Sequence, residues 1–217
     1  WEMRIKSPIL NINLFKNNLV FSFSNLAALI NYSATFAVGF LLSLYLQYIK
    51  GFSPAHAGLI LVSQPVIMAS ISPLAGRLSD RLEPRLISSI GMSLTTVGVI
   101  MLTFINNHTG LGYILASLVT LGLGFGLFSS PNTNAAMSSI EKKFYGVASS
   151  TLATMRLIGQ TLSLGIAMLL FGLYMGRVQI TPEYYPLFLS SVKTAFITFA
   201  VLCFGGIYAS LARGKTH

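Results

Sequence analysis

Six apolar stretches dominate this chain and limit the folds open to it. A helix that crosses a bilayer needs about 20 mostly apolar residues, because the hydrocarbon core is roughly 30 Å thick and a helix rises about 1.5 Å per residue. The stretches that meet this requirement lie near residues 19–49, 57–74, 86–105, 111–130 with an extension, 147–176 and 187–212. Short breaks rich in Gly, Pro and Asn separate them, and no break is long enough to hold a soluble domain. The sequence therefore predicts an all-α membrane protein with six transmembrane helices.

Charge composition supports a membrane location and argues against several other partners. Charged residues make up 9% of the 217 residues, whereas an ordinary soluble domain carries roughly 25%. The net charge is +9, but no basic stripe with interleaved aromatic residues occurs outside the apolar stretches, so a lipid surface is expected as partner and nucleic acid is not. Cys203 is the single cysteine and lies in an apolar stretch, which leaves no disulfide framework and no expected metal or cofactor site.

The distribution of Lys and Arg predicts how the helices are oriented. Loops on the cytoplasmic side of a membrane keep an excess of basic residues near the ends of the helices. One side collects Arg4, Lys6, Lys16, Arg77, Arg81, Arg85, Lys142, Lys143, Arg213 and Lys215, and the other has Lys50, Arg177 and Lys193. Both termini are therefore predicted in the cytoplasm and the helices in the plasma membrane. Residues 1–17 are expected to form a cytoplasmic entry segment, 18–212 the six-helix unit and 213–217 a cytoplasmic tail.

The loop between the second and third apolar stretches concentrates charge in the string "GRLSDRLEPR", residues 76–85. Taken alone, this string can be a hairpin that needs turn residues and anchoring positive charge. Its spacing also resembles the loop signature of the major facilitator superfamily, in the degenerate copy found in the second half of such proteins. In that family the loop acts as a cytoplasmic gate, and its Asp meets a helix N-terminus of the opposite half. The resemblance assigns the gating role to Gly76, Arg77, Asp80, Arg81 and Arg85.

Further stretches extend the resemblance over essentially the whole chain. Residues 7–22, 41–65, 122–139 and 145–167 resemble the C-terminal half of the fourteen-helix drug:proton antiporter branch. The resemblance implies that the six helices form one half of a major facilitator fold, built as a 3+3 inverted repeat, with the N-terminal half as partner. Because the chain begins with Trp1 rather than Met, we expect it to be a piece of a longer protein. The implied function is proton-coupled efflux of small amphipathic drugs or metabolites by alternating access.

The same resemblance indicates where a substrate cavity would lie. In the family, the first and fourth helices of each half line the central cavity. The candidates carried over to this sequence are Asn25, Asn31, Tyr32, Phe36, Phe40, Phe125, Phe128, Asn132 and Asn134. Aromatic rings with a few amides suit an amphipathic ligand, because an apolar pocket uses few directional contacts. Each aromatic residue taken singly can equally be a packing residue.

Arg156 is a charge placed well within the fifth apolar stretch. A central arginine costs about 2.5–3.5 kcal/mol on insertion scales, so such a residue is normally paired, lines a polar cavity or reaches back to the lipid headgroups. No Asp or Glu lies in any of the six stretches, so its partner is a carbonyl, a polar side chain or a group of the other half. For the same reason, we expect the proton-coupling site in the other half.

Small residues at four-residue spacing predict where helices pack closely, because membrane helices rely on such stripes to approach one another. One stripe contains Gly122, Gly126 and Ser130, and the other contains Gly159, Ser163 and Ala167.

A different class of function remains open, namely a six-helix membrane module that does not transport and instead assembles with or regulates a partner. An enzyme is not expected. The string "GMS" at residues 91–93 is a weak echo of a serine hydrolase, and no histidine lies in a span to act as base.

Overall fold

The computed structural model describes residues 15–16, 18–176 and 178–213, and within these ranges it contains helices and no strands. The long helices are α2 (Leu19–Leu44), α3 (Pro54–Leu61), α4 (Ser63–Ser79), α5 (Pro84–Thr103), α6 (Leu111–Ser138), α7 (Tyr145–Met175) and α8 (Tyr185–Ala212). A π-helical turn, Tyr45–Ile49, extends α2, and short 3₁₀ turns, Lys142–Phe144 and Pro182–Tyr184, precede α7 and α8. Taken with these turns, and with α3 and α4 as one span, they give six helical segments long and apolar enough to cross a membrane. The all-α prediction is confirmed.

The ends of the second and fourth spans lie further out than the sequence predicts. The second span runs from Pro54 to Ser79, because Ser53 caps the helix by accepting a hydrogen bond from the His56 amide. The fourth span continues through Pro131 to Ser138. A proline is tolerated there because neighbouring helices can satisfy the carbonyl that it frees.

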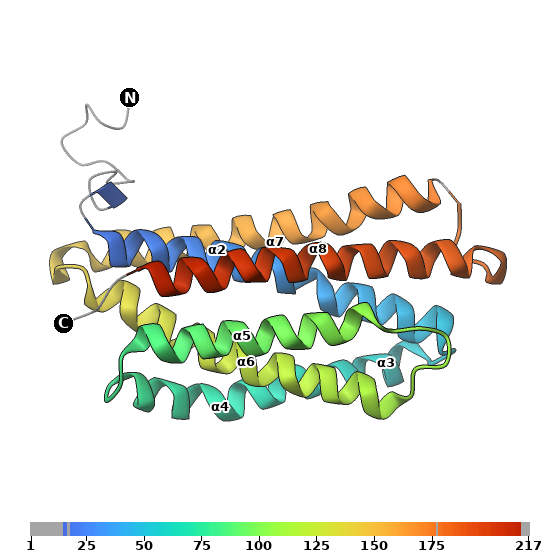
Figure 1. Cartoon of the computed structure of the whole chain (residues 1–217), viewed down its shortest axis with the longest axis horizontal. Helices are drawn as coiled ribbons and strands as arrows, with labels where there is room; N and C mark the ends of the chain where they lie inside the picture. Colours follow the sequence, from blue (N-terminus) through green and yellow to red (C-terminus); the bar gives the residue numbers. More distant parts are fainter. Residues whose placement is uncertain (1–14, 17, 177, 214–217) are drawn as a thin grey trace.

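The helices form two layers, and each layer takes helices from both halves of the sequence. Figure 1 shows α2, α7 and α8 in one layer and α4, α5 and α6 in the other. Contacts between α5 and α8, and between α2 and α6, join the layers. Each three-helix unit of the sequence therefore packs against the other unit, as expected for the 3+3 repeat that the resemblance implies.

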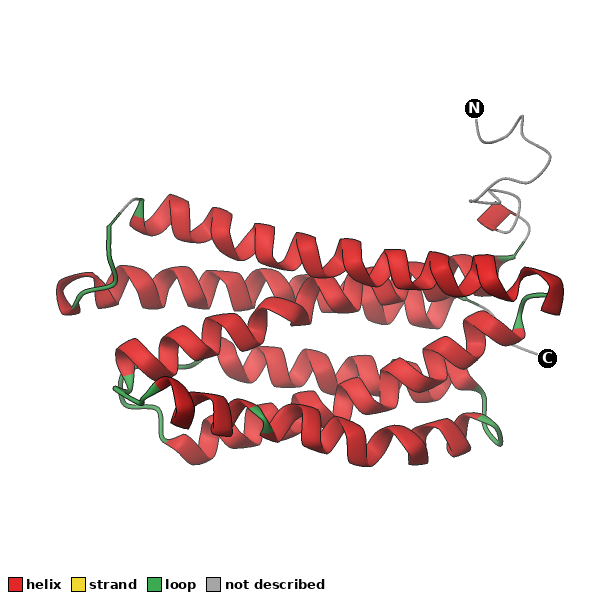
Figure 2. Ribbon diagram, turned by 180° about the vertical axis from the view of Figure 1, so that it is seen from behind, coloured by secondary structure: helices red, strands yellow, loops and turns green. Residues whose placement is uncertain are grey.

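Helix α2 begins and helix α8 ends at the same end of the bundle, at the right of Figure 2. The α4–α5 and α6–α7 connections lie at this end too. We call it the basic end, because it carries Arg77, Arg81, Arg85, Lys142, Lys143 and Arg213.

Glycines allow the helices of each layer to touch through their backbones. A Cβ atom built on Gly91 of α5 would lie 2.7 Å from the Gly124 carbonyl oxygen of α6, so these two glycines face each other. A Cβ atom on Gly122 would lie 2.6 Å from the Gln64 carbonyl oxygen of α4, and one on Gly159 would lie 2.6 Å from the Leu29 carbonyl oxygen of α2. The predicted stripes on α6 and α7 are thus confirmed as helix contacts.

Candidate functional site

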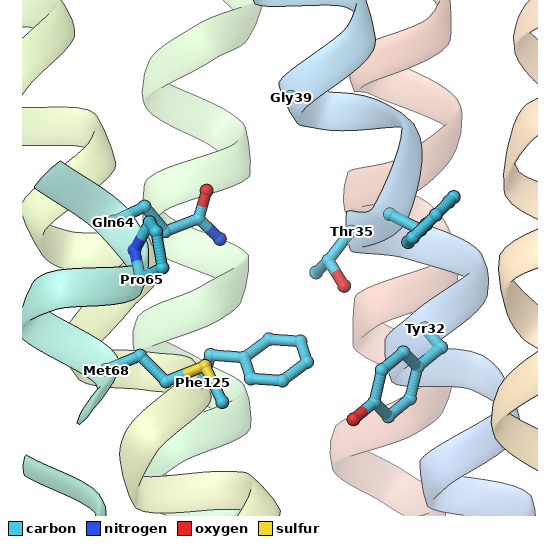
Figure 3. Close-up of a pocket in the computed structure, with 8 residues that line it drawn as sticks. Tyr32, Thr35, Gly39, Gln64, Pro65, Met68 and Phe125 are labelled. Atoms are coloured by element: carbon cyan, nitrogen blue, oxygen red, sulfur yellow. The ribbon is translucent and has the colours of Figure 1, made fainter. Parts of the chain in front are cut away.

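A pocket of about 380 Å³ lies between α2, α4 and α6 and is open on one side (Figure 3). It is lined by Tyr32, Thr35, Phe36, Gly39, Gln64, Pro65, Met68 and Phe125. Its volume falls at the lower end of the range of small-molecule sites, roughly 300–1,000 Å³. Aromatic and aliphatic groups make up most of the wall, and a few hydroxyl and amide groups interrupt it.

Helix α2 supplies one complete wall of the pocket. Tyr32, Thr35, Phe36 and Gly39 follow the i, i+3, i+4, i+7 spacing that brings side chains onto one face of a helix. From the opposite side, Phe125 of α6 meets the Tyr32 ring edge-to-face, with ring centroids 5.2 Å apart and an interplanar angle of 89°. In Figure 3, Phe125 points from α6 toward Tyr32. This aromatic pair closes the end of the pocket that lies toward the basic end.

Arg156 of α7 places a positive charge next to that aromatic pair. Its guanidinium lies 5.8 Å from the centre of the Tyr32 ring, and its Nη2 donates a hydrogen bond of 2.6 Å to the Thr133 hydroxyl of α6. The side chain is half-buried, and its Nε makes no hydrogen bond within the described part of the chain. Arg156 therefore has donor capacity to spare close to the pocket.

Three of the predicted cavity residues lie in the pocket wall, namely Tyr32, Phe36 and Phe125. Phe40 lies one turn beyond Phe36, is 38% exposed and packs against the Phe171 ring at 6.3 Å. Its place in a larger cavity stays a prediction.

The other predicted cavity residues lie between helices rather than in this pocket. Asn25, Asn31, Phe128 and Asn132 are all buried. The Asn25 amide donates to the Phe21 carbonyl at 2.9 Å, and the Asn31 amide lies 3.0 Å from the Met92 sulfur. Both asparagines thus face protein, as the cost of an amide in lipid requires.

Asn134 and the residues of the 76–85 loop meet at the basic end. The Asn134 amide donates to the Ser79 hydroxyl at 2.8 Å. A Cβ atom on Gly76 would lie 3.0 Å from the Ser130 hydroxyl, so α4 and α6 approach closely there. The loop therefore starts from a point that is fixed against α6.

The charged residues of the loop are more exposed than its first turn. Arg85 forms an ion pair with Glu83 at 3.6 Å. Arg77 and Arg81 line a shallow hollow of about 300 Å³ with Leu74 and Leu78. Asp80 caps the end of α4, is exposed and makes no side-chain hydrogen bond or ion pair with another described residue. Its proposed partner in another part of the protein is not tested.

Arg213 is a residue that sequence reasoning missed, since the sequence analysis counts it with the loop charges. It follows α8 directly and is only 1% exposed. Burial, and after it the charge of Arg85, lowers the pKa of Arg213 to about 10, so it stays positively charged at neutral pH. A buried cation among polar neighbours at a helix end leaves no periodic signal in the sequence.

No group of three or more His, Cys, Asp or Glu side chains that could hold a metal ion occurs among the residues that the structure describes. The chemistry of the site is therefore that of a binding pocket with one adjacent positive charge.

Comparison with known proteins gives a consistent result. The sequence profile of the Major Facilitator Superfamily matches residues 24–215. The riboflavin transporter RibZ of Clostridioides difficile is 33% identical over 155 residues, which is 71% of this chain and 34% of that protein. The multidrug transporter MdtP of Bacillus subtilis is 31% identical over 170 residues, 77% of this chain and 30% of that protein. The uncharacterized transporter YebQ of Escherichia coli is 30% identical over 160 residues, 74% of this chain and 35% of that protein. The chain thus spans about a third of the length of the curated relatives it matches.

Proposed function

The chain belongs to the major facilitator superfamily and is an integral membrane protein, and from this premise we propose that it forms the C-terminal half of a transporter for small amphipathic molecules. The observation that carries the proposal is the pocket between α2, α4 and α6, with Arg156 beside its aromatic end. The transport activity belongs to a longer protein, in which an N-terminal half covers the open side of the pocket.

The exposed aromatic face of α2 supports the presence of such a second half. Phe36 is 45% exposed and Phe40 is 38% exposed, although both belong to a helix whose other faces are largely buried. Arg156 lies within a span, where contact with lipid would be costly. A partner that covers α2 and α7 on this side would remove both problems, and it would enclose the pocket.

The pocket chemistry favours a planar or ring-containing substrate with hydrogen-bond acceptors. Tyr32, Phe36 and Phe125 offer ring faces and edges, and the free donors of Arg156 would suit carbonyl or anionic oxygen atoms. Relatives named as riboflavin and multidrug transporters fit this chemistry. We therefore propose flavin-like heteroaromatic molecules as the first substrates to test.

Coupling to protons and the direction of transport are part of the same proposal. None of the helices α2–α8 contains Asp or Glu, so a titratable carboxylate would have to come from the N-terminal half. The charge distribution supports a cytoplasmic location for the basic end, because cytoplasmic loops keep an excess of Lys and Arg. With this orientation, a plasma-membrane transporter driven by inward proton flow would export its substrate.

The proposal is tested with the full-length transporter in inside-out membrane vesicles under an imposed pH gradient. Uptake of riboflavin is compared with that of the cationic dye ethidium. Replacing Tyr32 by Ala removes one ring of the pocket, which is expected to lower kcat/KM about tenfold, equivalent to about 1.4 kcal/mol of binding.

Phe204→Ala provides the matched control. Phe204 is also a large aromatic residue within a span, but it lies on α8, is 58% exposed and does not line the pocket. Its variant is expected to transport normally. Uptake that does not respond to Tyr32→Ala or to Phe125→Ala would contradict the assignment of the pocket. If neither probe, nor any of a panel of ring-containing compounds, is transported by the abundant, folded protein, the non-transporting module becomes the better explanation.

A further inference from the structure

Three consecutive polar residues of α6 each bind a different helix. The Asn132 amide donates to the Ser24 carbonyl of α2 at 3.0 Å. The next residue, Thr133, accepts from Arg156 of α7, and the one after it, Asn134, donates to Ser79 at the end of α4. We call Asn132, Thr133 and Asn134 the α6 hub. It connects the helix that carries the charge beside the pocket with the helix that leads into the 76–85 loop.

Arg213 holds the first residue of the hub in place. Its Nη1 donates to the Asn132 amide oxygen at 2.9 Å and to the Ser24 hydroxyl at 3.3 Å. Its Nη2 donates to the Pro84 carbonyl at 3.0 Å and to the Ser88 hydroxyl. One guanidinium thus joins α8 to α2, α5 and α6 at the basic end.

The partners of Arg213 are all neutral, and this limits what the residue contributes to stability. Removing a charge from water is costly, and replacing a buried charge by an apolar residue of similar size is often neutral or stabilising. What the four hydrogen bonds do provide is direction, because the planar guanidinium fixes the relative positions of its acceptors. The contacts are therefore better suited to setting an arrangement of helices than to stabilising the fold.

We propose that Arg213 is a positioning residue for transport, which acts through Asn132 to fix the α6 hub and thereby the place of Arg156 beside the pocket. Asn132 lies seven residues from Phe125, roughly 10 Å along the helix, so a rotation of α6 at the hub also moves the pocket wall. The same rotation changes the position of Ser79, from which the 76–85 loop starts.

Two variants that each remove one partner of Arg213 separate this role from a structural one. Asn132→Ala breaks the link to α6, whereas Ser88→Ala breaks a link to α5 and leaves the hub untouched. In the full-length transporter, we expect the KM for riboflavin to rise about tenfold in Asn132→Ala and less than twofold in Ser88→Ala, with kcat nearly constant in both. Equal effects of the two variants, or an unchanged KM in Asn132→Ala, would overturn the proposal.

A double-mutant cycle tests whether Arg213 acts through the hub. Arg213→Met removes the guanidinium and keeps an apolar side chain, while Thr133→Val removes the hydrogen bond that holds Arg156. If Arg213 acts by positioning Arg156, the loss caused by Arg213→Met largely disappears in the Thr133→Val background. Independent, multiplying losses would contradict the proposal. If Arg213→Met does not accumulate in the membrane, the Asn132→Ala and Ser88→Ala pair decides the question alone.

The kinetic experiments rest on the proposed transport function, so a second measurement that needs no substrate accompanies them. Hydrogen–deuterium exchange reports local opening of the backbone in the same full-length variants. Asn132→Ala is expected to speed exchange at least threefold in residues 131–135 and in the α7 segment around Arg156, and Ser88→Ala is not. Faster exchange without any riboflavin transport would uphold the hub and reject the substrate. Equal exchange in both variants would reject the hub whatever the transport result.

Discussion

A methyl group added at Gly124 is expected to separate α5 from α6. Its Cβ atom would lie 2.5 Å from the Thr95 amide nitrogen and 2.8 Å from the Gly91 carbonyl oxygen, whereas ordinary van der Waals contact begins at 3.4 Å. The nearest of these are backbone atoms, which cannot rotate aside. The two helices must therefore move apart locally by about 0.9 Å, the difference between 3.4 Å and 2.5 Å.

The energetic cost of this separation follows from how membrane helices associate. Inserting a methyl group into a well-packed contact costs about 1–3 kcal/mol. Between helices in lipid, little hydrophobic gain offsets the lost packing. In a unit of this size, 1 kcal/mol corresponds to a change of roughly 2–4 °C in Tm, so Gly124→Ala is expected to lower Tm by about 5 °C. Because Phe125 is the next residue, the KM for riboflavin is also expected to rise.

Thermal unfolding of the purified full-length transporter in detergent measures this effect, with Gly165→Ala as the matched control. Gly165 lies in α7, and a Cβ atom there meets no atom within 4 Å. The control variant is expected to match the parent or exceed it slightly, because Ala favours the helix more than Gly. If Gly124→Ala unfolds at the same temperature as Gly165→Ala, the backbone contact between α5 and α6 is not as close as the structure describes, and the reasoning fails.

Three further predictions concern charge. Arg156→Gln removes the positive charge beside Tyr32, so the KM for riboflavin is expected to rise and that for ethidium to fall, each by about tenfold, in vesicle uptake assays; shifts in the same direction would contradict selection by charge. Asp80→Asn is expected to change the ratio of inward-open to outward-open protein about two- to fivefold, since a carboxylate at a helix N-terminus contributes about 0.3–1 kcal/mol; labelling of single cysteines from each side measures this ratio, and an unchanged ratio would leave the loop as a simple hairpin. Neutral replacements of all membrane carboxylates in the N-terminal half are expected to abolish pH-driven transport, and uptake that persists would place the coupling group elsewhere.

Much of the fold could be predicted because the lipid environment restricts it so strongly. A helix must satisfy its own backbone groups in the membrane, so an apolar stretch of sufficient length already defines the element. The first span, residues 19–49, has the predicted bounds, and Gly122 and Gly159 lie in helix contacts as their spacing indicates. Gly91 was missed because it has no small residue at four-residue spacing that would mark a stripe.

The pocket was harder to predict, because helix periodicity gives a face but not the depth at which a partner covers it. Phe125 and Phe128 are three residues apart on α6, yet Phe125 reaches the pocket while the Phe128 backbone lies against Gly91 of α5. Asn25 lies seven residues before Tyr32 and therefore on the same face of α2, but it is buried among the helices. Which part of a face stays open depends on how three helices diverge along their length, and that is a property of the tertiary structure.

The α6 hub does leave a signal in the sequence, although it is not a periodic one. Consecutive residues of an α-helix point about 100° apart, so Asn132, Thr133 and Asn134 together cover more than half of the helix circumference. In lipid, polar side chains on all these sides would need partners on all these sides. A run of three polar residues inside a long apolar span therefore predicts a helix that is surrounded by other helices at that depth. Here α6 contacts α2, α4, α5 and α7, and the hub bonds reach three of them. Loss of any one of these neighbours would leave an amide or hydroxyl facing lipid, so the hub ties the position of α6 to the assembly of the whole half.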